Sequence, residues 1–575
     1  MLLTWVIFPS LFLPLITIVY SYSHDAHDQI PLIGAETLPQ LDLLQTSIRE
    51  IQESLSDGRL TSVQLVETYL ARIERDNYQG LTLKAVIQSA PRQSALEIAF
   101  QLDEERSKGR IRSELHGIPI SVKDNIATDL ELGMRTTAGS LALKDSIVRK
   151  DAFVIENLRK AGAIVIAKTN LNELAGWKGI LKGFLPITSR DDSPKANVTF
   201  RGPTNGWSAV GGQCSSAYVE GGFDQGGDPM GSSSGSAVGL SVGWGAAAVG
   251  TDTLGSVLGP ASRAALYAIR PTLGRVSRKG VVPVSLDHDT IGPMGFTTWD
   301  VALMLEIMGG EDQEDQSTHD IPPLSNLTSI ASSPPNLSEF TIGIPTRYFS
   351  DEPFFEIPSG CPSESKIKFS ETLQHLQTNY GLNLKWDTNI NLSSLRDIQR
   401  FLEVLTDKIN IDFRADMDDY LTNDLKESKV RNMLGLAMFN DKYSSQELQP
   451  NECCQERILT SLTSSPRNST EHQRLKSELK VLADERSLGH IFDTNPEIDA
   501  IALDFELGAP GYWVGAANYP AGVVPLGYCS NGLPYGLMFV TRKYDEQRLI
   551  GLLAAYEKVM PKRGVPKPYQ ERYGK

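Results

Sequence analysis

The sequence predicts an α/β protein in which a mixed, mostly parallel β-sheet is surrounded by helices. Two observations carry this prediction. The hydrophobic period changes along the chain, from helical spacing over residues 62–77 to strict alternation over residues 118–123. A helical segment at 152–161 then precedes a short apolar run at 164–167. Strand, helix and strand in this order are typical of a right-handed βαβ unit.

The composition is compatible with one large core. The chain has 575 residues, of which 41% are hydrophobic and 22% charged, as in ordinary globular proteins. No internal repeat or clean linker interrupts it, so we expect one domain over residues 30–575, with a divergent segment at about 310–500. Within it, residues 320–338 are rich in Pro, Ser and Asn and indicate a surface connection. Further helices are expected at 38–56, 91–107, 236–244 and 545–559, and further strands at 246–250, 523–528 and 537–540.

The charge of the chain argues against a nucleic-acid partner. The formal net charge is −15 and the sequence pI is about 5.2. No run of basic residues reverses this balance locally. An acidic surface repels phosphate backbones, so binding to nucleic acid is not expected.

The N-terminal segment differs from the rest of the chain. Residues 2–20 contain no charged side chain and are interrupted by Pro9 and Pro14. This pattern predicts a secretory signal peptide over residues 1–22, and hence a protein of the secretory pathway or a secreted one. The alternatives are a buried helix and an uncleaved membrane anchor, because a span needs about 20 apolar residues. Membrane association is expected only if the segment stays uncleaved.

Two further features bear on the compartment. The five cysteines match no zinc or redox spacing, so one or two disulfides are compatible with the sequence and at least one thiol is left over. The Cys214 thiol is expected to be buried or idle. Five N-x-Ser/Thr sequons, which would make a secreted chain a glycoprotein, occur at Asn197, Asn326, Asn336, Asn391 and Asn468.

Three short segments contain residues suited to amide chemistry: 117–125, 231–236 and 250–256. A serine hydroxyl is a weak nucleophile until a base removes its proton, and no histidine falls in these segments. Lys123, at the end of an apolar strand, could act as the base if burial keeps its amine neutral. The glycine-rich turn before Ser256 could direct several backbone N–H groups at one oxyanion.

In this order the three segments resemble the signature of the amidase signature family. The resemblance covers residues of about 45–310 and 505–558, and we identify the chain as a eukaryotic, secreted-type member. It implies hydrolysis of a small-molecule amide through a serine acyl-enzyme, with no cofactor and no metal. The implied residues are Lys123 as base, Ser232 as a relay held by a cis peptide bond, Ser256 as nucleophile 24 residues later, and the backbone N–H groups of Thr253, Leu254, Gly255 and Ser256 as the oxyanion hole.

The chain departs from the family pattern near the nucleophile. Leu254 stands where the family usually has glycine, and Leu258 where it often has arginine. A positive φ at Leu254 would cost about 1–2 kcal/mol and could reshape the oxyanion hole. These departures leave open a second hypothesis, in which the chain is a non-catalytic or weakly active binding relative of the family.

A third hypothesis comes from another motif. Residues 231–235 also satisfy G-x-S-x-G, the nucleophile elbow of α/β-hydrolase esterases, with Ser233 as nucleophile and His288 and Asp289 downstream. That elbow requires a strand directly before it, and residues 221–229 do not form a strand pattern. The substrate is not fixed by the sequence, and a homodimer is compatible with it. The candidate pocket residues are Trp177, Trp207 and Trp513.

Overall fold

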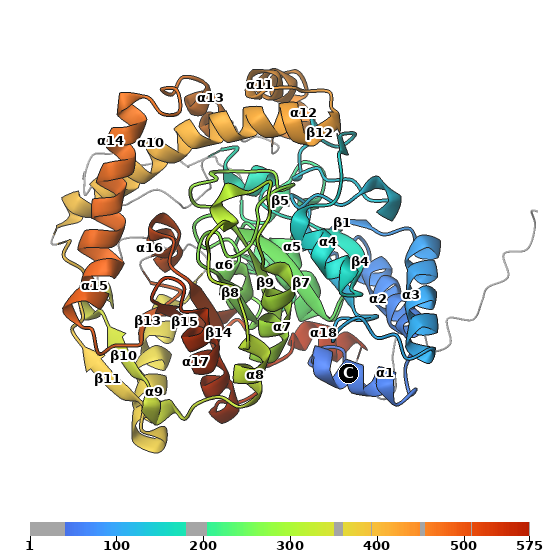
Figure 1. The fold of residues 1–575 in the computed structure, drawn as a ribbon, viewed down its shortest axis with the longest axis horizontal. Helices are drawn as coiled ribbons and strands as arrows, with labels where there is room; N and C mark the ends of the chain where they lie inside the picture. Colours follow the sequence, from blue (N-terminus) through green and yellow to red (C-terminus); the bar gives the residue numbers. More distant parts are fainter. Residues whose placement is uncertain are drawn as a thin grey trace, which may run out of the picture.

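The computed structural model describes residues 41–179, 204–349, 360–392, 394–448, 455–507 and 509–573. The predicted signal peptide at 1–22, the Asn197 sequon, Cys453 and Cys454 lie outside these residues. An 11-stranded sheet runs through the centre of the molecule (Figure 1). Its strand order is β1 (Val86–Ser89), β4 (Ile164–Thr169), β2 (Pro119–Lys123), β7 (Ala247–Asp252), β9 (Thr290–Gly295), β8 (Tyr267–Arg270), β14 (Ala521–Tyr528), β15 (Pro534–Thr541), β13 (Ala500–Asp504), β10 (Thr341–Ile344) and β11 (Asn383–Trp386).

The sheet confirms the α/β class, but it is mixed rather than mostly parallel. Of the ten strand pairs that the described residues form in it, four are parallel and six antiparallel. Adjacent strands joined by a short turn must be antiparallel, as β14 and β15 are. The predicted βαβ unit is present as β2, α4 (Phe153–Lys160) and β4, and its two strands form a parallel block with β7.

The helices lie on both faces of this sheet. Two small ladders accompany them, β3 (Ile147–Val148) with β12 (Leu425–Glu427) and β5 (Trp207–Ser208) with β6 (Gly212–Gln213). The helices are α1 (Ile48–Ser56), α2 (Ser62–Asp76), α3 (Arg92–Ser107), α4 (Phe153–Lys160), α5 (Ser234–Ser241), α6 (Leu258–Ser262), α7 (Thr298–Met308), α8 (Leu327–Ser332), α9 (Pro362–Tyr380), α10 (Leu395–Asp419), α11 (Met433–Lys442), α12 (Ser444–Glu447), α13 (Glu456–Leu462), α14 (Thr470–Lys480), α15 (Gly489–Thr494), α16 (Pro510–Ala517), α17 (Glu546–Val559) and α18 (Lys567–Tyr573).

Two expectations differ from the structure by more than a few residues. The helix predicted over 38–56 begins only at Ile48, because Ser47 and Glu50 form a capping box that starts it there. The connection expected over 320–338 contains the short helix α8. The divergent segment is part of the sheet, since it supplies β10 and β11.

Strand alternation produces two hydrophobic cores, one on each face. In β15, Leu537 and Phe539 belong to one core, whereas Met538 and Val540 belong to the other. The first core is covered by helices such as α1, α2, α4, α7 and α17, and the second by α5, α6, α10, α14 and α16. Helices α10 and α14 form an outer arc around the second face (Figure 1). Within the described ranges, every helix is too short or too polar to cross a bilayer.

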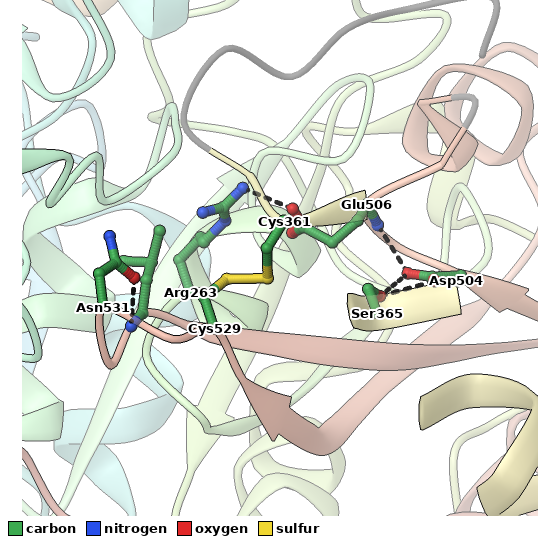
Figure 2. The surroundings of a disulfide bond; sticks show 8 residues. Arg263, Cys361, Ser365, Asp504, Glu506, Cys529 and Asn531 are labelled. Atoms are coloured by element: carbon green, nitrogen blue, oxygen red, sulfur yellow. Dashed lines mark hydrogen bonds and ion pairs between the residues drawn. A yellow bond between two sulfur atoms is a disulfide. The ribbon is translucent and has the colours of Figure 1, made fainter. Parts of the chain in front are cut away.

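One disulfide joins distant parts of the chain. Cys361, directly before α9, is bonded to Cys529, directly after β14, across 168 residues of sequence (Figure 2). It lies beside the buried ion pair of Arg263 and Glu506, whose side chains are 2.8 Å apart. The Cys214 thiol is free and buried, as expected.

We predict that this disulfide contributes measurably to stability. Cys529→Ser should lower the free energy of unfolding by about 2–4 kcal/mol, because the unfolded chain regains the entropy of an open loop. Thermal unfolding with and without a reductant measures the effect. The control is Cys214→Ala, whose reductant sensitivity should match that of the wild type. An unchanged transition in Cys529→Ser, with one free thiol fewer than the wild type instead of one more, would contradict the pairing.

Candidate active site

The parallel block of the sheet gathers the candidate residues at one edge. Strands β2 and β7 pair in parallel, with Val122 opposite Val249, so their carboxyl ends meet at the same edge. Lys123 is the last residue of β2, while Thr251 and Asp252 end β7. Lys123 and Asp252 are fully buried at this edge.

The amine of Lys123 contacts one serine and one threonine. Its Nζ lies 2.7 Å from Ser232 Oγ, 2.8 Å from Thr251 Oγ1 and 3.2 Å from Thr251 O. Burial lowers the pKa of Lys123 to about 7, although Asp252 and Asp289 act in the opposite direction. A neutral amine has two N–H groups and one lone pair. When both N–H groups donate to Thr251, the lone pair is left to accept the Ser232 hydroxyl proton.

The two serine segments lie against each other. The peptide bond between Gly231 and Ser232 is cis, as the resemblance implies. Ser233 N–H donates to Ser256 O at 3.1 Å, which places Ser256 beside the 231–233 turn. The Ser256 side chain is half-buried, and its Oγ forms no hydrogen bond with any residue that the structure describes. The structure therefore joins Lys123 to Ser232 directly, whereas Ser256 contacts the same turn through its backbone.

The loop of residues 253–256 presents unbonded backbone amides. Asp252 accepts from Gly255 N–H at 2.8 Å and from Val257 N–H at 2.7 Å. The Gly255 amide, expected in the oxyanion hole, is therefore occupied; this residue instead supplies a φ of +102°. Leu254 does not adopt a positive φ, so the strain expected there is absent. Across the described ranges, the amides of the loop without an acceptor are those of Thr253, Leu254 and Ser256.

Two further residues hold the 253–256 loop in place, and sequence reasoning missed both roles. Arg270 Nη1 donates to the Asp252 carboxylate and to Asp252 O, each at 2.7 Å. Thr253 Oγ1 donates to Asp289 at 2.6 Å, and Asp289 also accepts two backbone N–H groups. The sequence did contain a signal for the role of Arg270, because this arginine ends the apolar run 267–270 and a buried charge needs a partner of opposite charge. Thr251, which orients Lys123, was missed as well.

The nucleophile-elbow hypothesis is wrong. Ser233 is fully buried, and its Oγ donates to Thr251 O at 3.1 Å. Residues 227–230, directly before this turn, are described and form no strand. His288 Nδ1 lies 3.2 Å from Gly515 O, and burial lowers its pKa to about 3, so the ring stays neutral away from the serine. Asp289 is bonded to Thr253 instead of to His288.

One group of side chains has the composition of a metal site, but it already contains a cation. Asp287, Asp412 and His472 lie close together. Lys408 Nζ is 2.9 Å from Asp287 and 2.5 Å from Asp412, so it pairs with both carboxylates, and Lys476 also pairs with Asp287. The group is best described as an ion-pair network that joins α10 and α14 to the 285–289 loop.

The three tryptophans proposed as pocket residues differ in environment. Trp513 is only 3% exposed and stacks on Phe401 at 4.0 Å between ring centroids, so it is a packing residue. Trp177 is half-buried, and its Nε1 donates to Asn410 Oδ1 at 3.1 Å. Trp207 is half-buried in β5.

Comparison with known proteins identifies the family. The family model described as Amidase matches residues 64–184 and 208–362. A probable amidase of Arabidopsis thaliana is 32% identical over 534 residues, which cover 91% of each chain. The chain belongs to the amidase family. It is accordingly an amidase, an enzyme that hydrolyses amide carbon–nitrogen bonds.

Other similar proteins extend over almost the whole amidase chain. A glutamyl-tRNA(Gln) amidotransferase subunit from Chloroflexus aggregans is 28% identical and covers 90% of this chain and 97% of its own. The crystal structure of a peptide amidase from Stenotrophomonas maltophilia matches with a TM-score of 0.76 at 28% identity. It covers 91% of this amidase and 98% of the peptide amidase. The mixed α/β fold is thus shared over most of the chain.

The buried amine predicts a pH dependence of the amidase. A protonated Lys123 has no lone pair, so kcat/KM should rise about tenfold per pH unit below the pKa of about 7 and level off above it. Rates of amide hydrolysis between pH 5 and 9 measure this. Asp504 is the control, because burial also raises its pKa to about 7. The rising limb should persist in Asp504→Asn and vanish in Lys123→Ala; its survival in Lys123→Ala would contradict the assignment.

Proposed function

We propose that this amidase cleaves the amide bond of a small molecule through an acyl-enzyme on Ser256, with Ser232 relaying a proton to Lys123. The observation that carries the proposal is the 2.7 Å contact between Lys123 Nζ and Ser232 Oγ. The two Thr251 oxygens beside the amine support it, because they leave the Lys123 lone pair to face Ser232.

The first half of the reaction forms the acyl-enzyme. Ser256 Oγ attacks the carbonyl carbon while its proton passes to Ser232 Oγ, and the Ser232 proton passes to Lys123 Nζ. The carbonyl oxygen becomes an oxyanion that accepts from the unbonded amides of the 253–256 loop. The proton then returns from Lys123 through Ser232 to the leaving nitrogen, the carbon–nitrogen bond breaks, and the amine departs.

The second half uses the same residues for hydrolysis. Water attacks the ester carbonyl and gives its proton through Ser232 to Lys123. Collapse of the second tetrahedral intermediate returns that proton to Ser256 Oγ and releases the carboxylic acid. The relay also requires the Ser256 hydroxyl, which forms no hydrogen bond with a described residue, to donate to Ser232, and catalytic hydrogen bonds of this kind often tighten only when substrate binds.

The substrate class follows from the similar proteins and the predicted compartment. The peptide amidase supports a small amide, which includes the amide of a peptide, as substrate. The amidotransferase relative supports an alternative in which the chain works inside a larger assembly. The secretory signal peptide predicted over residues 1–22 favours the first, because aminoacyl-tRNA is not a substrate of that pathway.

We also propose that the enzyme enters the secretory pathway as a glycoprotein. Four of the sequon asparagines lie in described residues, and each of them is exposed. The disulfide between Cys361 and Cys529 is of a kind that persists in oxidising compartments. Both observations agree with the signal peptide predicted from residues 2–20.

We predict that a fluorophosphonate probe labels Ser256 and inactivates the enzyme. The reason is that phosphonylation requires a nucleophilic hydroxyl beside a base and oxyanion donors, as acylation does. Peptide mapping by mass spectrometry locates the label. Lys123→Ala should lower the labelling rate and turnover by about 10²–10⁴, the usual contribution of a general base.

The matched control for labelling is Ser233→Ala, which should retain the label because its hydroxyl is bonded inside the protein. No labelling of the folded wild type, together with no turnover on aliphatic, aryl and peptide amides, would support the non-catalytic binding relative instead.

Glycosylation gives the test of the compartment. Expression of the full chain in a eukaryotic secretory host should give a product whose mass falls after treatment with an N-glycosidase. Substitution of the exposed Asn326, Asn336, Asn391 and Asn468 by Gln should remove most of that shift. A protein retained in the cytosol without glycan would contradict the proposal.

A further inference from the structure

Helix α16 touches the 253–256 loop through bare backbone. A Cβ on Gly515 would lie 2.2 Å from Thr253 O and 2.8 Å from Leu254 Cα. A Cβ on Gly511 would lie 2.7 Å from Gly255 Cα. The two glycines are four residues apart, so they lie on one face of the helix. The contact between helix and loop is therefore so close that no larger residue fits at either position.

This contact adds to the polar bonds that hold the loop, one of which, from Arg270 Nη1, also reaches Thr253 O at 3.3 Å. Asp252 holds the Gly255 amide, and Asp289 holds the Thr253 hydroxyl. Helix α16 meets the loop at Thr253 O and at the Cα atoms of Leu254 and Gly255. Any displacement at this contact would therefore move the amides of Thr253 and Leu254 directly.

Helix α16 is itself held in place by contacts with α10 and with the 285–289 loop. Trp513 stacks on Phe401 of α10, with ring centroids 4.0 Å apart and planes 7° apart. His288 Nδ1 lies 3.2 Å from Gly515 O, and Asn518 Nδ2 donates to Asp287 O at 2.9 Å. The helix is thus a rigid support whose position is set by the divergent segment and by the 285–289 loop.

We infer that Gly511 and Gly515 are positioning residues for the oxyanion hole, and that α16 fixes the distance between its amides and the reacting carbonyl. The inference rests on the proposed function. Amides that serve as oxyanion donors must lie within about 3 Å of the developing charge, and a misplacement of 1 Å can lower the rate about 10²-fold. An alanine at position 515 would force a shift of that order.

The test is Gly515→Ala in the full-length, disulfide-bonded enzyme. We expect kcat to fall about 10²-fold, with KM within about twofold of the wild type, because the loss falls on the transition state. An aldehyde analogue of the best amide substrate, whose adduct with Ser256 places an oxygen in the hole, should lose affinity by the same factor. The affinity of the carboxylic acid product should stay unchanged.

The matched control is Gly551→Ala, another buried glycine inside a helix. A Cβ there would meet Pro335 at 3.4 Å, an ordinary contact, so kcat, KM and aldehyde affinity should remain at the wild-type values. A second variant, Phe401→Leu, removes the stack behind α16 without touching the loop. We expect it to lower kcat about tenfold at constant KM, which keeps the inference testable if Gly515→Ala does not fold.

The outcomes separate this inference from the proposed function. A wild-type kcat in folded Gly515→Ala would overturn the positioning role, and so would equal losses of affinity for the aldehyde and for the acid product. Neither result would affect the proposed function as long as Ser256→Ala is inactive. Activity retained in Ser256→Ala would overturn the proposed function itself.

Discussion

The site depends on one arrangement, a lysine amine buried among neutral oxygens. Lys123 Nζ meets only the hydroxyls of Ser232 and Thr251 and one carbonyl oxygen, and within the described part of the chain no carboxylate is in contact with it. A direct ion pair would stabilise the ammonium and remove the base. The two nearby carboxylates are occupied elsewhere, Asp252 by backbone amides and Arg270, and Asp289 by Thr253 and backbone amides.

A second buried lysine shows how much this arrangement matters. Lys168 lies in β4, next to β2, and is as fully buried as Lys123. Its amine donates to Ile126 O at 2.8 Å and, unlike that of Lys123, lies 3.6 Å from a carboxylate, Asp124, which opposes the lowering of its pKa by burial. It supports the loop that follows Lys123. Burial alone therefore does not distinguish a base from a structural cation; the identity of the neighbouring oxygens does.

The sequence predicted the catalytic residues that lie in short motifs of consecutive residues. Lys123, Ser232 and Ser256 lie in short motifs, and the strands beside them have clear periods, so their positions could be predicted before any coordinates. Arg270 and Asp289 could not be assigned, because they meet the 253–256 loop only after β8 and β9 have folded beside β7. The antiparallel direction of β8, β9 and β13 was missed for the same reason, since their pairing partners β14, β7 and β15 lie far away in sequence and leave no local pattern.

Leu254, which stands where the family usually has glycine, shows how contacts with distant residues determine whether a substitution strains the backbone. From the motif alone, we expected that a positive φ at Leu254 would strain the oxyanion hole. In the fold its backbone takes an ordinary conformation, and its side chain packs into the second core. That side chain occupies space that Gly515 leaves free, since a Cβ on Gly515 would lie 3.0 Å from Leu254 Cδ2. Because Gly515 has no side chain, Leu254 fits behind the loop, so the departure from the pattern changes the packing there and leaves the loop amides unbonded.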